Sequence, residues 1–364
     1  MRQLTKFPDQ TLLGAEGPFV TLYQAEDPST LSMDAEQIKF KNMIKKALNQ
    51  VDNEKLRQRL EDVPTDRMFW AEGRRGIAFF FTPEETYYYE VSSKLKDFVS
   101  YGERPNILPL IEDFQYMNNY HLLCLTSEDM RLYRGKMEEI TPIDLPEDAP
   151  KTLEIALGTE LTRGDNLASG GNTPGNLHGV TETSVEQDID QTNYFRMVDK
   201  YVMDNFSQPE QTQLILFALS ENQADFRELS KNNYLQDERI ESSPTSLSDN
   251  EIKQHVKKLI DEVSYKRHSL NIERYQETTP QYKLGDQYQD LATASLEGRI
   301  ETLFVEKDSK VTGTIDENGQ LGYEGDENFF NQLALNVVRT NGTVYVLDRS
   351  QMPELKDVAA ILRY

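Results

Sequence analysis

The residues of this chain best suited to chemistry gather in one glycine-rich segment, from Arg163 to Gly179. It holds five glycines, three asparagines and one proline, with hardly any large apolar side chain. Gly170 and Gly171 permit backbone conformations and close approaches that other residues do not, and Asn172 adds a side-chain amide. Such a loop suits insertion into a tight, backbone-lined cavity. A Gly- and Asn-rich surface loop is also a common simple connector, and the sequence leaves both readings open.

The common catalytic signatures are absent. There is no Gly-x-x-x-x-Gly-Lys-Ser/Thr phosphate loop, no Gly-x-Ser-x-Gly elbow, no His-Glu-x-x-His pair and no convincing dinucleotide fingerprint. Asp316 and its acidic neighbours partly match a calcium loop, but Leu321 stands where the turn needs glycine, which favours a solvated hairpin. We therefore expect no metal and no cofactor. The histidines are too scattered for a local zinc site: His121, His178, His255 and His268.

Composition favours a globular cytoplasmic protein. No stretch approaches the ~18 apolar residues of a membrane span, and the first residues lack the apolar core of a signal peptide. The single cysteine, Cys124, sits in an apolar run, so we expect it in a core; the alternative, a reactive thiolate, would need activation in apolar surroundings.

The net charge of −23 argues against broad binding to nucleic acid, DNA included, so any RNA contact must be local. Two lysine-rich stretches are candidates, although each is also what a solvated helix face looks like. The first, on a predicted helix, is the candidate RNA-contact set: Lys39, Lys41, Lys45 and Lys46. The second lies later in the chain: Lys253, Lys257, Lys258, Lys266, Arg267 and His268.

The order of predicted elements gives three small domains of α/β and α+β class. An α+β domain is expected over residues 1–148, ending in a proline-rich stretch. A middle α/β domain, 149–270, carries the loop 163–179 and then a helix that we expect to start at a capping box of Ser184 and Gln187. A C-terminal α/β domain follows over 271–364. In the first domain, Ile38, Ile44, Leu48 and Val51 are expected to form the apolar face of the lysine-bearing helix.

Several phrases of the sequence, in this three-domain order, resemble the bacterial relatives of archaeo-eukaryotic class 1 release factors and Pelota. The resemblance covers nearly the whole chain. Its phrases include residues 38–42, Phe69-Trp70 with residues 76–80, residues 177–179 ahead of 194–199, residues 298–305 and 342–347, Met352-Pro353 and the terminal 359–364.

The resemblance implies a setting in translation. In that family the first domain approaches the decoding site, the middle domain reaches the peptidyl-transferase centre, and the last resembles a small ribosomal-protein fold. It implies a ribosomal partner (rRNA, and tRNA as a candidate), a candidate translational GTPase, and no membrane or DNA partner. The implied loop contacts are Gly170, Gly171, Asn172, His178 and Gly179.

Three functions remain open from the sequence. The first, which we favour, is a ribosome-associated factor in termination, rescue or silencing. The second is peptidyl-tRNA hydrolysis with Asn172 as the catalytic residue, where hydrolytic relatives carry glutamine; asparagine is one methylene shorter, and a displacement of about 1 Å can cost on the order of a hundredfold in such a reaction. The third is a non-ribosomal protein-interaction module on the same scaffold.

Overall fold

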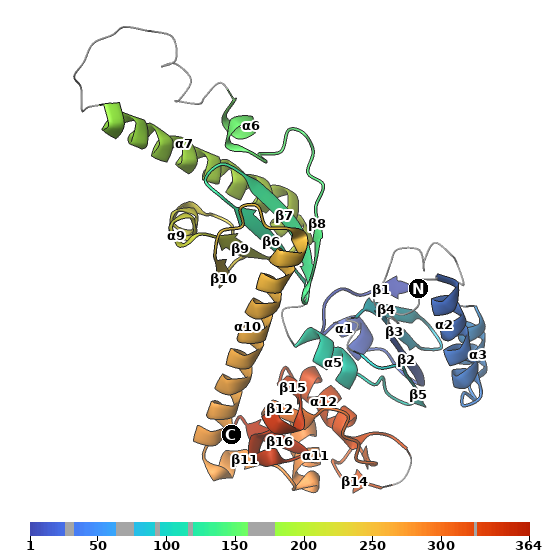
Figure 1. The fold of residues 1–364 in the computed structure, drawn as a ribbon. Coiled ribbons are helices and arrows are strands. Elements are labelled where there is room, and N and C mark those ends of the chain that lie inside the picture. The colour runs from blue at the N-terminus through green and yellow to red at the C-terminus, as the bar shows by residue number, and fades with distance from the viewer. Residues whose placement is uncertain (26–32, 63–75, 92–94, 116–118, 159–178, 324–325) are drawn as a thin grey trace. The chain divides into compact units, whose positions relative to one another are not determined.

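The computed structural model describes residues 1–25, 33–62, 76–91, 95–115, 119–158, 179–323 and 326–364. The chain divides into two compact units. One combines the two ends of the chain, Met1–Tyr116 with Lys266–Tyr364, and the other is continuous, Met117–Tyr265. The larger sheets have four or five strands each, with helices packed on them (Figure 1). The mixed α/β architecture predicted from the sequence is confirmed.

The first sheet has the strand order β1-β4-β3-β2-β5. Its central strand β3 (Gly76–Phe81) is buried along its whole length, because helices cover both faces of the sheet. Alternate side chains point to opposite faces. Phe79 therefore joins the core under α2 and α3, while Phe80 joins the core with α1 and α5. The other bounds are β1 (Arg2–Gln3), α1 (Gln10–Leu13), β2 (Phe19–Ala25), α2 (Met33–Leu48), α3 (Glu54–Glu61), β4 (Thr86–Glu90), β5 (Phe98–Gly102) and α5 (Leu108–Phe114).

The sheet of the middle unit has the order β10-β9-β6-β7-β8. Its strand β6 (Asn119–Leu125) shows the same alternation: Leu122 packs under α10, and Leu123 packs under α7 and α9. The sheet is thus covered on both faces. The other bounds are β7 (Met130–Lys136), β8 (Glu139–Pro142), α6 (Leu153–Leu157), α7 (Gly179–Val202), the π-helical turn η3 (Met203–Ser207), α8 (Gln208–Glu210), β9 (Gln213–Ala218), α9 (Ser220–Leu229), β10 (Leu235–Glu241) and α10 (Asp249–Glu277).

The last sheet has the order β11-β16-β12-β15. Leu303 on β12 packs with α11 and α12, and the neighbouring Phe304 faces the other way, in edge-to-face contact with Tyr275 of α10 at 6.0 Å between ring centroids. The bounds are η4 (Pro280–Tyr282), β11 (Lys283–Leu284), α11 (Tyr288–Leu296), β12 (Ile300–Glu306), β13 (Thr314–Ile315), β14 (Leu321–Gly322), α12 (Phe329–Arg339), β15 (Thr343–Leu347), η5 (Arg349–Gln351), η6 (Pro353–Leu355) and β16 (Val358–Leu362).

Two local predictions are wrong. Ile38 was expected on the apolar face of α2, but its side chain is 58% exposed. The buried residues Phe40, Ile44 and Ala47 define the inner face, and Ile38 lies about 200° around the helix from Phe40. The helix expected to start at Ser184 begins earlier, at Gly179. No proline or glycine lies between the two positions, so nothing in the sequence stops the helix from extending back to Gly179.

The compact units do not follow the predicted division at residues 148 and 270. Strands β6 to β8 precede residue 148, yet they belong to the sheet of the middle unit because β6 pairs in parallel with β9. The proline-rich stretch therefore lies within that unit instead of ending the first one. The three-domain assignment itself stays a prediction. No helix in the described part of the chain is long and apolar enough to span a bilayer.

Cys124 lies in the core of the middle unit, as predicted, with 1% of its surface exposed. Burial raises the pKa of its thiol to about 12. Since the thiolate is the reactive form, we expect the folded protein to resist thiol reagents at pH 8. Titration with a chromogenic disulfide should release about one equivalent of product only in denaturant. Fast labelling of the native protein would contradict this assignment.

Candidate functional site

The candidate RNA-contact lysines lie on helix α2, whose inner face packs into the first core through Phe40, Met43, Ile44 and Ala47. These residues follow the i, i+3, i+4, i+7 spacing of an amphipathic helix. The lysines at positions 41, 45 and 46 are exposed. The packing of one face thus fixes which lysines are presented to solvent.

The four lysines differ in their partners. Lys39 is held in place: its Nζ donates to the backbone oxygen of Ala25 at 2.6 Å and lies 2.9 Å from an Asp97 carboxylate oxygen. Lys41, Lys45 and Lys46 have no hydrogen-bond or ion-pair partner among the described residues. In a chain of net charge −23, these three cations are free to meet an anion.

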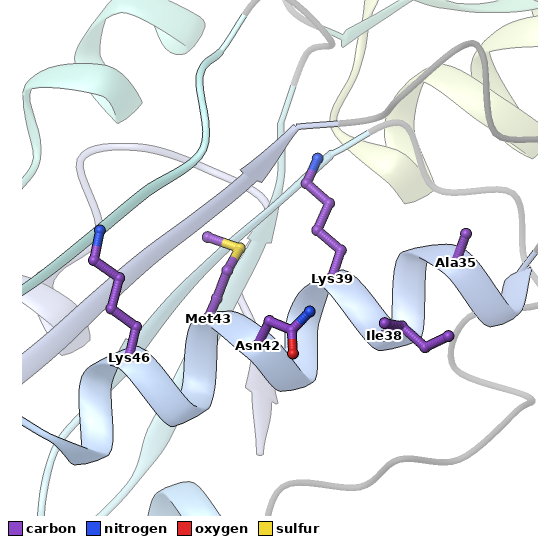
Figure 2. A pocket seen from close by; sticks show the side chains of 6 residues that line it. All are labelled: Ala35, Ile38, Lys39, Asn42, Met43 and Lys46. Carbon is purple, nitrogen blue, oxygen red and sulfur yellow. The ribbon is translucent and has the colours of Figure 1, made fainter.

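A shallow depression of about 490 Å³ runs along the side of α2 that carries Lys39 and Lys46. Figure 2 shows Lys39 and Lys46 rising from the same side of the helix, with Met43 between them. The exposed Ile38 contributes apolar surface to the same depression. Of the four candidate lysines, Lys39 and Lys46 line this depression. The sequence analysis did not single out its other lining residues, which are Ala35, Ile38, Asn42 and Met43.

The second candidate site is the glycine-rich loop. Gly170, Gly171, Asn172 and His178 lie outside the described residues, and Gly179 is the first residue of α7. The structure does describe how that helix is anchored. Tyr194, Phe195 and Val198 are fully buried, and the Asp199 carboxylate accepts bonds from the Ser230 hydroxyl at 2.5 Å and the Lys231 backbone nitrogen at 2.8 Å. The chain after the loop therefore runs into a helix that the core of the middle unit holds firmly.

Two of the described histidines are buried and lie against polar partners. His121 is 1% exposed, with Nε2 at 3.1 Å from a Glu210 carboxylate oxygen, and Arg134 holds the other oxygen of that carboxylate at 2.5 Å. His268 is also buried, with Nδ1 at 3.1 Å from the Gln351 amide. Within the described ranges no group of three or more His, Cys, Asp or Glu side chains is arranged to hold a metal ion.

Burial lowers the pKa of both buried histidines, although Glu210 opposes the effect at His121 and Asp348 opposes it at His268. The unfolded chain therefore binds more protons than the folded protein once the pH falls below the ordinary imidazole pKa of about 6.5. We therefore expect the two histidines to leave the free energy of unfolding undiminished above that pH and to lower it as the pH falls further. Urea unfolding at pH 7.5 and 5.5 measures this loss, and His121→Gln with His268→Gln should reduce it. An unchanged loss in the double variant would assign it to other groups.

The lysines of α10 differ from those of α2. Lys253 lies 2.5 Å from Glu139 and Lys257 lies 2.9 Å from Glu138, so acids of the β7–β8 hairpin neutralise them. Lys258 pairs along the helix with Glu262 at 3.8 Å. This second lysine-rich stretch is a solvated, paired helix face over those positions.

In the hairpin with the partial calcium pattern, the first acid of the pattern has a structural role. The Asp316 carboxylate accepts bonds from the backbone nitrogens of Asn318 and Gln320, at 2.9 and 2.7 Å, and Gly319 takes the left-handed conformation with φ of 78°. The acid thus shapes the turn between β13 and β14.

A protein-family model matches part of this chain. Residues 118–262 match the model of bacterial archaeo-eukaryotic release factor family 6. That segment nearly coincides with the compact middle unit, Met117–Tyr265. No match is found among the curated proteins.

Solved structures similar to this chain include translation factors. The archaeal translation termination factor aRF1 is 11% identical, with 96% of this chain and 93% of that chain covered and a TM-score of 0.25. Ribosome-bound archaeal Pelota is 12% identical over 75% and 73%, with a TM-score of 0.38. Dom34 from S. cerevisiae, a translation termination-like factor, is 9% identical over 86% and 78%, with a TM-score of 0.40. Over residues 118–262 this chain is thus similar to the bacterial archaeo-eukaryotic release factors, as the sequence resemblance predicted.

Proposed function

We propose that this protein is a ribosome-associated translation factor that acts in termination, rescue or silencing of ribosomes. The observation that carries the proposal is the match of residues 118–262 to a release-factor family. Because the matched segment is a compact unit with its own two-faced core, the similarity concerns a whole folded body.

Helix α2 supplies the proposed RNA contact. Lys41, Lys45 and Lys46 are exposed and have no partner among the described residues, whereas the lysines at 253, 257 and 258 already face carboxylates. Phosphates attract unpaired cations, so α2 offers the stronger local site on an otherwise acidic chain. Lys39 has a mainly structural role in this proposal, since Asp97 and Ala25 hold its ammonium group.

The loop 163–179 is the proposed probe of the peptidyl-transferase centre, with Gly170, Gly171, Asn172, His178 and Gly179 as its contacts. Support comes from the family match and from the helix that follows the loop, because α7 is anchored by buried aromatic residues and by Asp199. A translational GTPase is the proposed further partner.

Co-sedimentation with ribosomes tests the proposal. Purified protein should pellet with ribosomes at low salt and be released as the salt concentration rises, since phosphate contacts weaken with salt. Protein that stays in the supernatant at low salt, with both idle and stalled ribosomes, would reject the ribosomal function.

A release assay then separates binding from hydrolysis. If Asn172 acts as the hydrolytic amide, Asn172→Ala should abolish peptide release from stalled ribosomes and Asn172→Gln should increase it, by restoring the length of the amide. No release by the wild type or by either variant, with co-sedimentation intact, would assign the loop a binding role alone.

A further inference from the structure

The two ends of the chain share one apolar core. Leu13, Ile107 and Ile111 come from the first 116 residues, yet they pack in a cluster whose other buried members come from α11, α12, β13 and the last sheet. Leu291, Leu303 and Phe330 are among them. The residues from the first part are almost completely buried, with at most 4% of their surface exposed. The first part of the chain therefore depends on the last part to shield these side chains from water.

A buried amide lies at the centre of this contact. Asn331 of α12 is 6% exposed, and its Nδ2 donates to the backbone oxygen of Pro105 at 3.0 Å. Its Oδ1 accepts from the backbone nitrogen of Ile107 at 2.8 Å. Removing the Asn331 amide while the two ends stay packed would leave the Pro105 oxygen and the Ile107 nitrogen buried without partners, which is costly.

The side-chain amide of Gln115 pairs with the backbone at the edge of the last sheet. Strand β15 is an edge strand, so one side of its backbone lacks a neighbouring strand. Gln115, directly after α5, donates from Nε2 to the Val346 oxygen and accepts from the Val346 nitrogen at Oε1, both at 2.8 Å. A side chain from the first part thus takes the place of a strand.

Polar groups surround the shared core. The Arg339 guanidinium donates to the Leu13 backbone oxygen at 2.9 and 3.1 Å. The Glu327 carboxylate accepts from the Glu103 backbone nitrogen at 3.2 Å and lies 3.4 Å from Arg104. A further ion pair joins Lys307 to Glu112. Every one of these contacts joins residues more than 190 positions apart.

We propose that the two ends of the chain unfold as one cooperative body, in which hydrogen bonds of the Asn331 and Gln115 amides hold the first part to the last. Residues 117–265 form an inserted unit that unfolds independently. The lysine-bearing helix α2 and the C-terminal sheet then belong to the same body. This inference stands apart from the proposed ribosomal function, because it concerns folding within the chain alone.

Hydrogen exchange of the full chain, followed by mass spectrometry, tests the proposal. In Asn331→Ala, exchange should accelerate by about tenfold or more, and by the same factor in β2 and β3 as in β12 and β16. Strands β6 and β9 should exchange at the wild-type rate. Acceleration confined to β12 and β16 would overturn the proposal.

Asn232 provides a matched control in the middle unit. It is 5% exposed, its Nδ2 donates to the Ser207 hydroxyl at 3.0 Å, and its Oδ1 accepts from the Tyr234 nitrogen at 3.0 Å. Asn232→Ala should accelerate β6 and β9 and leave β2, β3, β12 and β16 unchanged. Equal acceleration everywhere would mean that the whole chain is one cooperative body, against the proposal.

Two milder variants keep the test decisive if Asn331→Ala does not fold. Gln115→Ala removes only half-buried hydrogen bonds, which water can replace. Phe79→Leu destabilises the first sheet in a core cluster that contains no residue of the last part. Each should accelerate exchange in β3 and β12 by a common factor. A response of β3 alone to Phe79→Leu would show that the two ends unfold separately.

Discussion

Gly135→Ala should destabilise the middle unit by about 3 kcal/mol, the range of severe overpacking in a core. Gly135 on β7 is the cross-strand partner of Tyr120 on β6, whose ring lies over the glycine. An added Cβ would stand 2.1 Å from two ring carbons of Tyr120. The ring is buried and its hydroxyl donates to the Met137 backbone oxygen at 2.7 Å, so it has no room to move aside.

Urea unfolding, monitored through hydrogen exchange in β6 and β9, measures this loss of stability in the middle unit. Gly102→Ala is the control, since the nearest atom to its new Cβ is a Glu327 carboxylate oxygen at 3.2 Å, far outside the 2.1 Å clash at Gly135. We expect the control to change the free energy of unfolding by less than about 1 kcal/mol. A small effect of Gly135→Ala would mean that the Tyr120 ring has another place to pack.

Replacing Lys41, Lys45 and Lys46 together by glutamine should weaken ribosome binding by about tenfold to a hundredfold at physiological salt, because up to three phosphate contacts are lost. The slope of log affinity against log salt concentration should become shallower by about two to three. Glutamine keeps a straight side chain of good helix propensity, so α2 should remain folded. Quantitative co-sedimentation over a salt series gives both numbers.

The matched control replaces Lys253, Lys257 and Lys258 of α10 by glutamine. It removes the same charge from lysines that already face Glu139, Glu138 and Glu262. We expect little change in binding or in its salt dependence. Equal losses in both variants would indicate a general effect of net charge, and wild-type binding by the α2 variant would place the RNA contact elsewhere.

Local patterns were the most predictable part of the fold. The apolar spacing of residues 288–296 is typical of a helix, and the structure has α11 at Tyr288–Leu296. Ser248 and Glu251 have the spacing of a capping box, and the structure forms it, with the Ser248 nitrogen 2.8 Å from the Glu251 carboxylate. Such features depend on residues a few positions apart, so periodicity and capping rules find them.

Long-range pairing was not predictable from the same rules. The β6 segment has the strand pattern of its neighbours in sequence, and nothing in it specifies β9 as a partner. The contacts of Asn331 with Pro105 and Ile107 span more than 220 positions and carry no local signature. At the candidate RNA surface, residue type identified the four lysines, but only the structure separates the paired Lys39 from Lys41, Lys45 and Lys46.

The division of one unit between the two ends of the chain has a consequence for synthesis. The 149 residues from 117 to 265 are made between its two parts, which takes roughly 7–30 s at bacterial or eukaryotic elongation rates. During that interval Leu13, Ile107 and Ile111 lack the C-terminal side chains that cover them in the finished protein. The middle unit is made before the last part of the chain, and the first sheet keeps this apolar surface uncovered until α11, α12 and the last sheet have been synthesised.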